Sequence, residues 1–470
     1  MTDYAKNLQD FYGREDYVLL AGKQGETAIE ASFKELTYIP RKTTPLPGLM
    51  AEKMLKEFAG QGAQPTALYL HIPFCNLRCS YCSFFRNSFE AEQVEEYVQA
   101  LLAELEHLEQ QGVFAKQKLE AVFFGGGTPS VLSPQQINAI LQKIHSVAKL
   151  TEDCELTFES SIYDLDADKL NACLDGGINR FSFGVQSFDT QLRRSLGRLN
   201  AKEEVTAKLE EVAAKDVKVI IDLIYGLNGQ TTELLLEDIR TALACGVSGM
   251  DLYKLQIMPK SPLGQAIAKG NISYAYNDRM LAEMFIAADT LLAEQGARAL
   301  SCCHWAMRED ERSHYNTLVK SGANVIACGT ACGGHLGLYK YMKTMDRADY
   351  VKKSHAGQYA VMGMGRLSEQ YHLLDKLSGQ CDAGCLDFSL LKRYSDADWQ
   401  QLLKPLLEQW ELLGLLYSMD GQYHFTAKGK YYYRQLDRVL LTAAEYALYG
   451  KPGLMEQAGQ KMMGLMKNMK

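Results

Sequence analysis

The segment HIPFCNLRCSYCSFF, residues 71–85, carries Cys75, Cys79 and Cys82 at the spacing C-x3-C-x2-C. It directly follows the apolar run ALYLHI (67–72), which predicts a β-strand. A loop at the end of a strand can fold three thiolates around one metal centre, and three soft ligands suit an iron–sulfur cluster. In a reducing compartment, clustered cysteines are more often metal ligands than disulfides.

The segment lacks a fourth ligand, because position 84 is Phe and no neighbouring Cys or His pair completes a set. A structural zinc site requires four protein ligands, so this pattern disfavours structural zinc. An iron–sulfur cube with three protein ligands keeps one iron open for a chelating substrate. The sequence therefore predicts a cluster that takes part in chemistry.

Downstream of the cysteines, short apolar runs alternate with amphipathic helical stretches such as VEEYVQALLAELEHLEQ and EVTAKLEEVAAK. Such alternation predicts parallel strands with right-handed crossovers, and six units predict an α/β fold with a partial (β/α)6 barrel. In such folds the loops at the carboxyl ends of the strands carry the chemistry. The six predicted strands are ALYLHI (67–72), LEAVFF (119–124), CELTFES (154–160), RFSFGV (180–185), VKVIIDLIYGL (217–227) and GMDLYKL (249–255).

The changes of pattern predict four regions: an N-terminal extension (1–64), the barrel core (65–300), a substrate-pocket or connecting region (301–380) and a C-terminal domain (381–470). In the last, LLKRYSDADWQQLLKPLLEQWELLGLL predicts two helices, and a hairpin-like stretch continues through DGQYHFTAKGKYYYRQL. This order is typical of a winged helix, for which a structural or substrate-covering role is favoured over DNA binding. The Met-rich tail, LMEQAGQKMMGLMKNMK, predicts a docked amphipathic helix.

Composition narrows the function classes. The 470 residues carry a formal net charge of −7 and are 47% hydrophobic, which predicts a soluble protein without a basic field for nucleic acid or anionic membrane. No segment reaches the roughly 18 apolar residues of a membrane span. The first residues lack the order of a secretory signal, so we expect a cytoplasmic protein.

The cysteine spacing after a first barrel strand resembles the motif of the radical S-adenosylmethionine superfamily. YLHIPFC with the later YC, followed by FGGGTPS, resembles its coproporphyrinogen dehydrogenase-like branch. The resemblance spans about residues 65–440. It implies a [4Fe–4S] cluster on the three cysteines, whose open iron binds S-adenosylmethionine and whose reduction yields a deoxyadenosyl radical.

The same resemblance implies contacts to S-adenosylmethionine. Two aromatic residues, an acid and a glycine loop match positions that hold a first molecule: Tyr69, Tyr81, Glu159, Gly125, Gly126, Gly127 and Thr128. Gln186, Arg198 and Asp222 match residues that hold a second molecule, and Gln186 and Asp222 are also candidate catalytic residues. Each has an alternative interpretation, such as a capping acid, a surface charge or a strand-face aromatic.

The branch contains three functions. The first is an oxygen-independent coproporphyrinogen oxidase-like decarboxylase, whose further cysteine is replaced here by Phe84. The second is a heme-binding chaperone, whose heme motif is only partly echoed around His314, Tyr315 and Asn316. The third is the heme-utilisation anaerobilin synthase group, which LHIPFCNLRCSYCSFFRN and LYKLQIMPKSPL resemble most.

The third function implies that a methyl group is transferred from a second S-adenosylmethionine to heme, and that ring opening releases iron and a linear tetrapyrrole. It also implies heme or a related porphyrin as substrate. The expected electron donor is a flavodoxin-like or NAD(P)H-dependent reductase.

Heme would need an axial ligand, for which His335 is favoured over His304 and His314 because glycines flank it. Beside it, Cys328 and Cys332 are alternatives, whereas the pairs Cys302–Cys303 and Cys381–Cys385 are weak candidates for an auxiliary cluster. We interpret Lys340, Lys343 and Arg347 as charges on a solvated helix, with heme propionates as the alternative partners.

Overall fold

The computed structural model describes residues 4–13, 43–82 and 87–450, and these fold as two compact units. One unit comprises residues 44–319 and 323–367, and we call it the sheet unit. The other comprises residues 1–43, 320–322 and 368–470, and we call it the helical unit. The predicted tail helix (454–470) and Phe84 lie outside the described residues.

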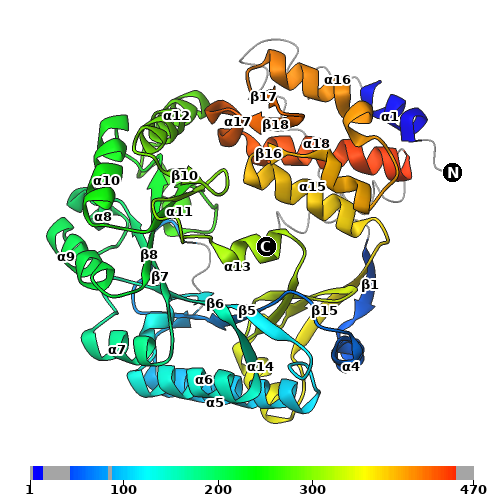
Figure 1. Cartoon of the computed structure of the whole chain (residues 1–470). Helices are drawn as coiled ribbons and strands as arrows, with labels where there is room; N and C mark the ends of the chain where they lie inside the picture. The colour runs from blue at the N-terminus through cyan, green and yellow to red at the C-terminus, as the bar shows by residue number, and fades with distance from the viewer. Residues whose placement is uncertain (1–3, 14–42, 83–86, 451–470) are drawn as a thin grey trace. The chain divides into compact units, whose positions relative to one another are not determined.

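The sheet unit is built on one large open sheet, drawn in Figure 1. In the described residues thirteen strands follow the order β1-β15-β14-β13-β12-β2-β5-β6-β7-β8-β9-β11-β10. The strands are β1 (Thr43–Pro47), β2 (Thr66–Ile72), β5 (Lys118–Gly126), β6 (Lys149–Ser160), β7 (Arg180–Gln186), β8 (Lys218–Tyr225), β9 (Gly249–Lys254), β10 (Arg298–Ala299), β11 (His304–Ala306), β12 (Asn324–Cys328), β13 (Gly333–Leu336), β14 (Tyr339–Lys343) and β15 (Val361–Leu367).

All six predicted strands are present as β2, β5, β6, β7, β8 and β9, and each pairs in parallel with its neighbour. Because the order runs from β1 to β10 without closing, the fold is the partial barrel that the sequence predicts. The strand β12 pairs in parallel with β2 on its other side, with Ala327 opposite Tyr69. A short separate pair, β3 (Phe74–Cys75) and β4 (Asn87–Ser88), follows β2.

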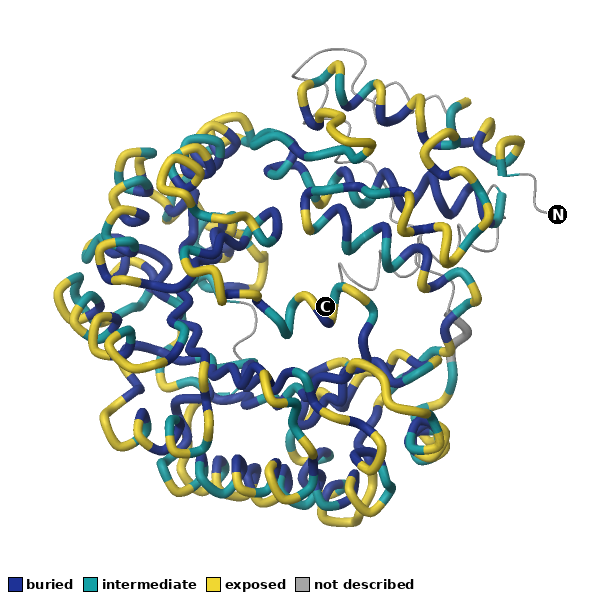
Figure 2. Tube along the Cα trace, in the orientation of Figure 1, coloured by how far each residue is buried: buried dark blue, intermediate teal, exposed yellow. Residues whose placement is uncertain are grey.

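Helices cover the outer face of this sheet, and one short helix lies on its inner face. Figure 2 shows the strands largely buried and the outer helices exposed along one side. The predicted helices at 94–110 and 204–215 are confirmed as α5 and α9. Besides the inner helix, the sheet unit contains η1 (Gly48–Met50), α4 (Ala51–Gly60), α5 (Ala91–Gln110), η2 (Pro129–Val131), α6 (Pro134–Val147), α7 (Ala167–Asp175), α8 (Thr190–Ser195), α9 (Lys202–Ala213), α10 (Thr232–Ala244), α11 (Pro262–Ala268), α12 (Asp278–Glu294) and α14 (Arg347–His355).

The inner helix is α13 (His314–Lys320). Its Leu318 packs with Ala67 of β2 and Ala121 of β5, whose small side chains let the helix approach the strands closely. The backbone N–H groups of His314 and Tyr315 donate to the carboxylate of Glu155 at 3.0 and 3.1 Å. A side chain of β6 therefore caps the start of this helix.

In the segment for which the sequence predicts two helices and then a hairpin-like stretch, the helical unit contains a 3-10 helix, an α-helix and a two-stranded hairpin. It comprises α1 (Tyr4–Tyr12), α15 (Tyr371–Ala383), β16 (Cys385–Leu386), η3 (Phe388–Arg393), α16 (Trp399–Leu412), β17 (Leu416–Met419), β18 (Gln422–Phe425), α17 (Ala427–Tyr431) and α18 (Tyr433–Tyr449). The predicted hairpin-like stretch through residue 436 is too long. The Thr426 side chain accepts from the Gly429 N–H, and this cap begins a helix directly after β18.

The interpretation of Lys340, Lys343 and Arg347 as solvated helix charges is wrong for the first two, because residues 339–343 form β14. Lys343 is fully buried and forms an ion pair with Glu104 of α5. The same carboxylate accepts from the Tyr350 hydroxyl at 2.7 Å and from the Gly329 N–H at 2.8 Å. Arg347 begins α14 and pairs with Glu96.

Substituting Lys343 tests this buried pair. Lys343→Met should lower the free energy of unfolding by about 3–5 kcal/mol, because it leaves the Glu104 carboxylate buried without its cation. Adding Glu104→Gln should recover part of the loss, since the amide needs no cation. The measurement is chemical denaturation, with Lys353→Met at the exposed pair with Asp349 as the matched control. Equal losses at the two lysines would contradict the assignment.

Candidate active site

The residues that the sequence singles out gather at the carboxyl ends of the strands of the sheet unit. Cys75 ends β3 directly after β2, and the glycine loop begins in the last residues of β5. Glu159 is near the end of β6, Gln186 ends β7, and Asp222 lies on β8. The parallel pairing of these strands therefore brings five chain segments to one edge of the sheet.

The cysteine loop is anchored on several sides. The Ser80 N–H donates to the Leu196 carbonyl at 3.0 Å, and the Ser80 carbonyl accepts from the Leu263 N–H at 2.8 Å. The Thr128 hydroxyl lies 3.4 Å from the Cys75 sulfur. Burial raises the pKa of the Cys75 thiol to about 11, so a positive partner such as a metal is needed to hold it as a thiolate.

The three cysteines form no disulfide bond and are partly exposed. Within the described residues, no group of three His, Cys, Asp or Glu side chains is already arranged around a metal position. The donor set nevertheless fits a cluster with one open iron, because three thiols come from a single loop held by backbone hydrogen bonds. The pairs Cys302–Cys303 and Cys381–Cys385 form no such group either.

The glycine loop presses against the cysteine-bearing strand. The Gly127 N–H donates to the Ile72 carbonyl, and the Thr128 N–H donates to the Phe74 carbonyl, both at 2.8 Å. A Cβ atom on Gly127 would lie 2.5 Å from the Phe74 oxygen. Gly126 has φ +111°, and a Cβ there would lie 2.5 Å from the His71 ring. Both positions therefore require glycine for the two segments to meet.

Glu159 faces this loop. Its Oε2 accepts from the Gly126 N–H at 3.2 Å, and a Cβ on Gly125 would lie 2.9 Å from the same oxygen. Burial raises the pKa of Glu159 to about 7. A cationic ligand, such as an ammonium group, stabilises the ionised form of a buried carboxyl group whose pKa is raised.

Gln186, Arg198 and Asp222 form a second group. A Cβ on Gly184 would lie 2.9 Å from Gln186 Nε2 and 3.1 Å from Arg198 Nη2, and Gly184 is the register partner of Asp222. Gln186 has φ +66° at a bulge of β7, a conformation that is strained for a non-glycine residue. Its Oε1 and the Arg198 Nε are buried without a hydrogen-bond partner within the described residues.

One contact links the two groups: Arg198 Nη2 donates to the Tyr81 hydroxyl at 3.4 Å, beside the last cysteine of the loop. Burial is the largest cause that raises the pKa of Asp222 well above its ordinary value, followed by the neighbouring charge of Asp251. The second group therefore combines a guanidinium group, an amide side chain with an unpartnered acceptor atom on a strained backbone, and a carboxyl group with a raised pKa.

An aromatic group lies on the inner face beside the first group. The Tyr69 ring stacks on Phe123 and on Tyr315, with centroids 6.0 and 6.1 Å apart, and its hydroxyl lies 3.2 Å from His71 Nδ1. Sequence reasoning missed Tyr315 as a member of this group. No local sequence pattern predicts the position of Tyr315, because it depends on α13 crossing the inner face of the sheet.

Sequence reasoning also missed a buried set of charged side chains next to the second group, where Asp251 is the register partner of Asp222. His304 lies between Asp251 and Glu311, at 3.1 and 3.3 Å, and Glu311 pairs with Arg180 at 3.1 Å. The charged residue inside each apolar run, Asp251 in GMDLYKL and Arg180 in RFSFGV, was the available signal. His304 is thus placed within a network of charges.

The other heme-ligand candidates are placed as follows. The two ring nitrogens of His335 lie 3.2 and 2.9 Å from the carbonyl oxygens of Ala323 and Gly337, a geometry that disfavours iron ligation. His314 Nε2 lies 3.4 Å from Glu120. Cys328 and Cys332 are buried.

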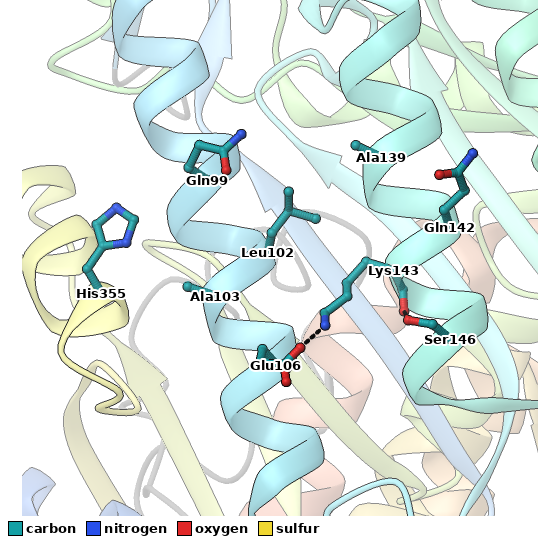
Figure 3. A pocket seen from close by; sticks show the side chains of 9 residues that line it. All are labelled: Gln99, Leu102, Ala103, Glu106, Ala139, Gln142, Lys143, Ser146 and His355. Carbon is teal, nitrogen blue, oxygen red and sulfur yellow. Dashed lines mark hydrogen bonds and ion pairs between the residues drawn. The ribbon is translucent and has the colours of Figure 1, made fainter.

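Figure 3 shows a shallow hollow between α5, α6 and α14 that contains none of the candidate residues, and its Lys143 pairs with Glu106.

The chain matches a known family and several characterised proteins. The profile of the radical SAM superfamily matches residues 69–242. Anaerobilin synthase of Escherichia coli O157:H7 is 30% identical over 381 residues, which cover 80% of this chain and 84% of that protein. Heme chaperone HemW of Bacillus subtilis is 30% identical over 371 residues, 77% of this chain and 95% of that protein.

A solved structure supports the fold. Coproporphyrinogen III oxidase HemN from Escherichia coli superposes with a TM-score of 0.73 over 88% of this chain and 98% of its own, at 21% identity. Among the described residues, none of the helices combines the length and apolar character needed to cross a bilayer.

The raised pKa of Glu159 predicts a pH-dependent stability. A carboxyl whose pKa is raised to about 7 by folding stabilises the fold at acidic pH and loses that contribution as pH rises towards 8. In cofactor-free protein, Glu159→Gln should therefore be more stable than wild type by about 1–3 kcal/mol at pH 8 and close to it at pH 5. Thermal denaturation at both pH values measures this difference. An equal difference at both would contradict the burial of this acid.

Proposed function

Because the chain belongs to the radical SAM superfamily, we propose that it is a methyltransferase that opens heme without oxygen. In this proposal the products are the linear tetrapyrrole anaerobilin and free iron. The observation that carries it is the 30% identity to anaerobilin synthase, which extends over 84% of that protein. An iron–sulfur cluster and S-adenosylmethionine are the cofactors of the superfamily.

Cys75, Cys79 and Cys82 would hold the [4Fe–4S] cluster. When bound, the reduced cluster and S-adenosylmethionine supply a carbon-centred radical. The chain positions the thiols through the Thr128 hydroxyl and the backbone contacts of Ser80. The absence of cysteine at position 84 leaves the loop with three thiols.

The glycine loop and Glu159 would bind the methionyl end of the first S-adenosylmethionine. The glycines let the backbone approach a ligand without side chains in the way, and Glu159 offers a carboxyl whose charge an ammonium group would stabilise. Tyr69 and Tyr81 flank this position in the sequence motif and would line the ligand.

Gln186, Arg198 and Asp222 would bind a second S-adenosylmethionine as methyl donor. Arg198 would pair with the ligand carboxylate, and the free Oε1 of Gln186 would accept from its ammonium group. Asp222 would face positive charge on the same ligand. Polar groups left without protein partners in a buried position are those that a polar ligand can satisfy.

The planar substrate would lie against the stacked aromatic residues of the inner face, Tyr69, Phe123 and Tyr315, of which the two tyrosines are partly accessible to a large flat ring. The one-electron supply would come from a flavodoxin-like or NAD(P)H-dependent reductase. A heme chaperone without turnover is the second candidate, because the identity to HemW extends over 95% of that relative.

One anaerobic incubation tests the proposal. Protein with a reconstituted cluster is mixed with heme, S-adenosylmethionine and a strong reductant, and the products are analysed by mass spectrometry. We expect 5′-deoxyadenosine, S-adenosylhomocysteine and a methylated linear tetrapyrrole. Tight heme binding without these products would favour the chaperone, and carbon dioxide from coproporphyrinogen would favour a decarboxylase.

Cys79→Ala should abolish cluster absorption and reduce product formation at least a hundredfold, because two thiols do not retain the cluster. Cys385→Ala is the matched control, since this partly exposed thiol belongs to the helical unit. Activity retained in Cys79→Ala would contradict the proposal.

A further inference from the structure

Two carboxyl groups lie side by side on the inner face of the sheet. Asp222 of β8 and Asp251 of β9 are register partners on neighbouring parallel strands, and such partners are roughly 5 Å apart. Asp251 is 7% exposed, and Asp222 retains a partly exposed surface at the edge that carries the second group. Two carboxyls this close, one buried and one only partly exposed, do not readily both ionise without a compensating cation.

The cation lies on one side of the pair. His304 Nδ1 is 3.1 Å from Asp251 Oδ2, and the other ring nitrogen is 3.3 Å from Glu311. His304 is 2% exposed, and Glu311 is in turn paired with Arg180. A histidine between two carboxylates is stabilised as the imidazolium, and the pKa of His304 is raised to about 9 in spite of its burial.

Asp222 has no equivalent partner. Within the described residues it forms no ion pair. The titratable groups that face it are Asp251 of β9, Glu159 of β6, Arg180 of β7 and Arg198 after α8, together with the phenol of Tyr253 on β9, which lies beside both carboxyls of the pair. Burial and the charge of Asp251 favour its protonated form more than the two arginines oppose it. Because His304 lies against Asp251 and not against Asp222, the geometry favours the negative charge of the pair beside His304 and the proton on Asp222.

We propose that His304 is a positioning residue that acts through Asp251: it keeps Asp251 ionised, and Asp251 keeps Asp222 protonated until a cationic ligand binds. The proposal rests on the function proposed above, because the ligand is the S-adenosylmethionine assigned to Asp222. Binding of its positive charge beside Asp222 then releases the proton of that carboxyl to solvent. No bond other than the O–H bond of Asp222 is broken in this step.

The proton release makes the affinity for the ligand depend on pH. Below the pKa of Asp222 in the free protein, ligand binding must remove a proton, so affinity rises with pH. Neutralising Asp251 removes the neighbouring negative charge and lowers the pKa of Asp222. The rise in affinity then moves to lower pH. Replacing His304 by a neutral residue also moves the rise in affinity to lower pH. Without the imidazolium beside it, Asp251 takes the proton from Asp222, so ligand binding no longer has to release that proton.

The experiment is calorimetric titration of S-adenosylmethionine into the anaerobically reconstituted full chain, between pH 5 and 9. Each pH is measured in two buffers of different ionisation enthalpy, which gives the number of protons released. The binding step that disappears in Asp222→Asn identifies the site. For wild type we expect that step to release close to one proton at the acidic end of this range, and fewer protons as the pH rises.

Asp251→Asn and His304→Gln should each shift the pH dependence of that step downward by about one unit and reduce the proton release. His107→Gln is the matched control, because His107 is a buried histidine 3.1 Å from Glu52 on the outer face. It should leave the pH dependence unchanged. Thermal denaturation of each variant shows that it is folded, and Asp251→Asn keeps the test available if His304→Gln does not fold.

The outcomes separate this inference from the proposed function. Wild-type protein that binds no S-adenosylmethionine overturns both. Wild-type binding with an unshifted pH dependence in both variants overturns only the inference. A shift in Asp251→Asn without a shift in His304→Gln assigns the effect to Asp251 alone and rejects the role of His304.

Discussion

A carboxyl group buried among parallel strands must either have a cation beside it or keep its proton, and the inner face of this sheet is organised around that requirement. Glu155 lies 3.8 Å from Arg180 and also accepts from the first N–H groups of α13. Through that helix it fixes Tyr315 against Phe123, at a centroid distance of 4.6 Å. The charge balance of the interior thereby sets the position of the aromatic surface.

The same requirement is left unmet at the edge where the functional residues gather. Glu159 and Asp222 have raised pKa values, and the Gln186 and Arg198 side chains each contain a buried polar atom without a partner. Elsewhere in the sheet unit, charges such as Lys343 and Glu104 are fully paired. Buried atoms without a hydrogen-bond partner also occur elsewhere in the described part of the sheet unit, at His304, Asp238 and Ser354. The edge is distinguished because two such side chains lie there with two carboxyls of raised pKa, a combination typical of a site completed by a ligand.

Local patterns were sufficient for the six strands from β2 to β9 that the sequence predicts and for the helices α5 and α9, because each depends on residues near in sequence. They failed for contacts that join distant segments. The pair of His304 and Asp251 spans more than fifty residues, and Tyr315 reaches its place only because Glu155 caps α13. Lys343 was misjudged for the same reason, since its partner Glu104 lies on α5, far earlier in the chain. The predicted hairpin was too long because one side-chain cap at Thr426 begins a helix directly after β18.

The strand order has a consequence for biosynthesis. β2, which leads into the cysteine loop, is flanked by β5 on one side and by β12 on the other. During translation β5 emerges early, whereas residues 324–328 leave the ribosome some 250 residues after β2. For that interval β2 has one unpaired edge, open to association with other nascent chains. Insertion of iron and sulfide before β12 docks would therefore occur on a half-built sheet.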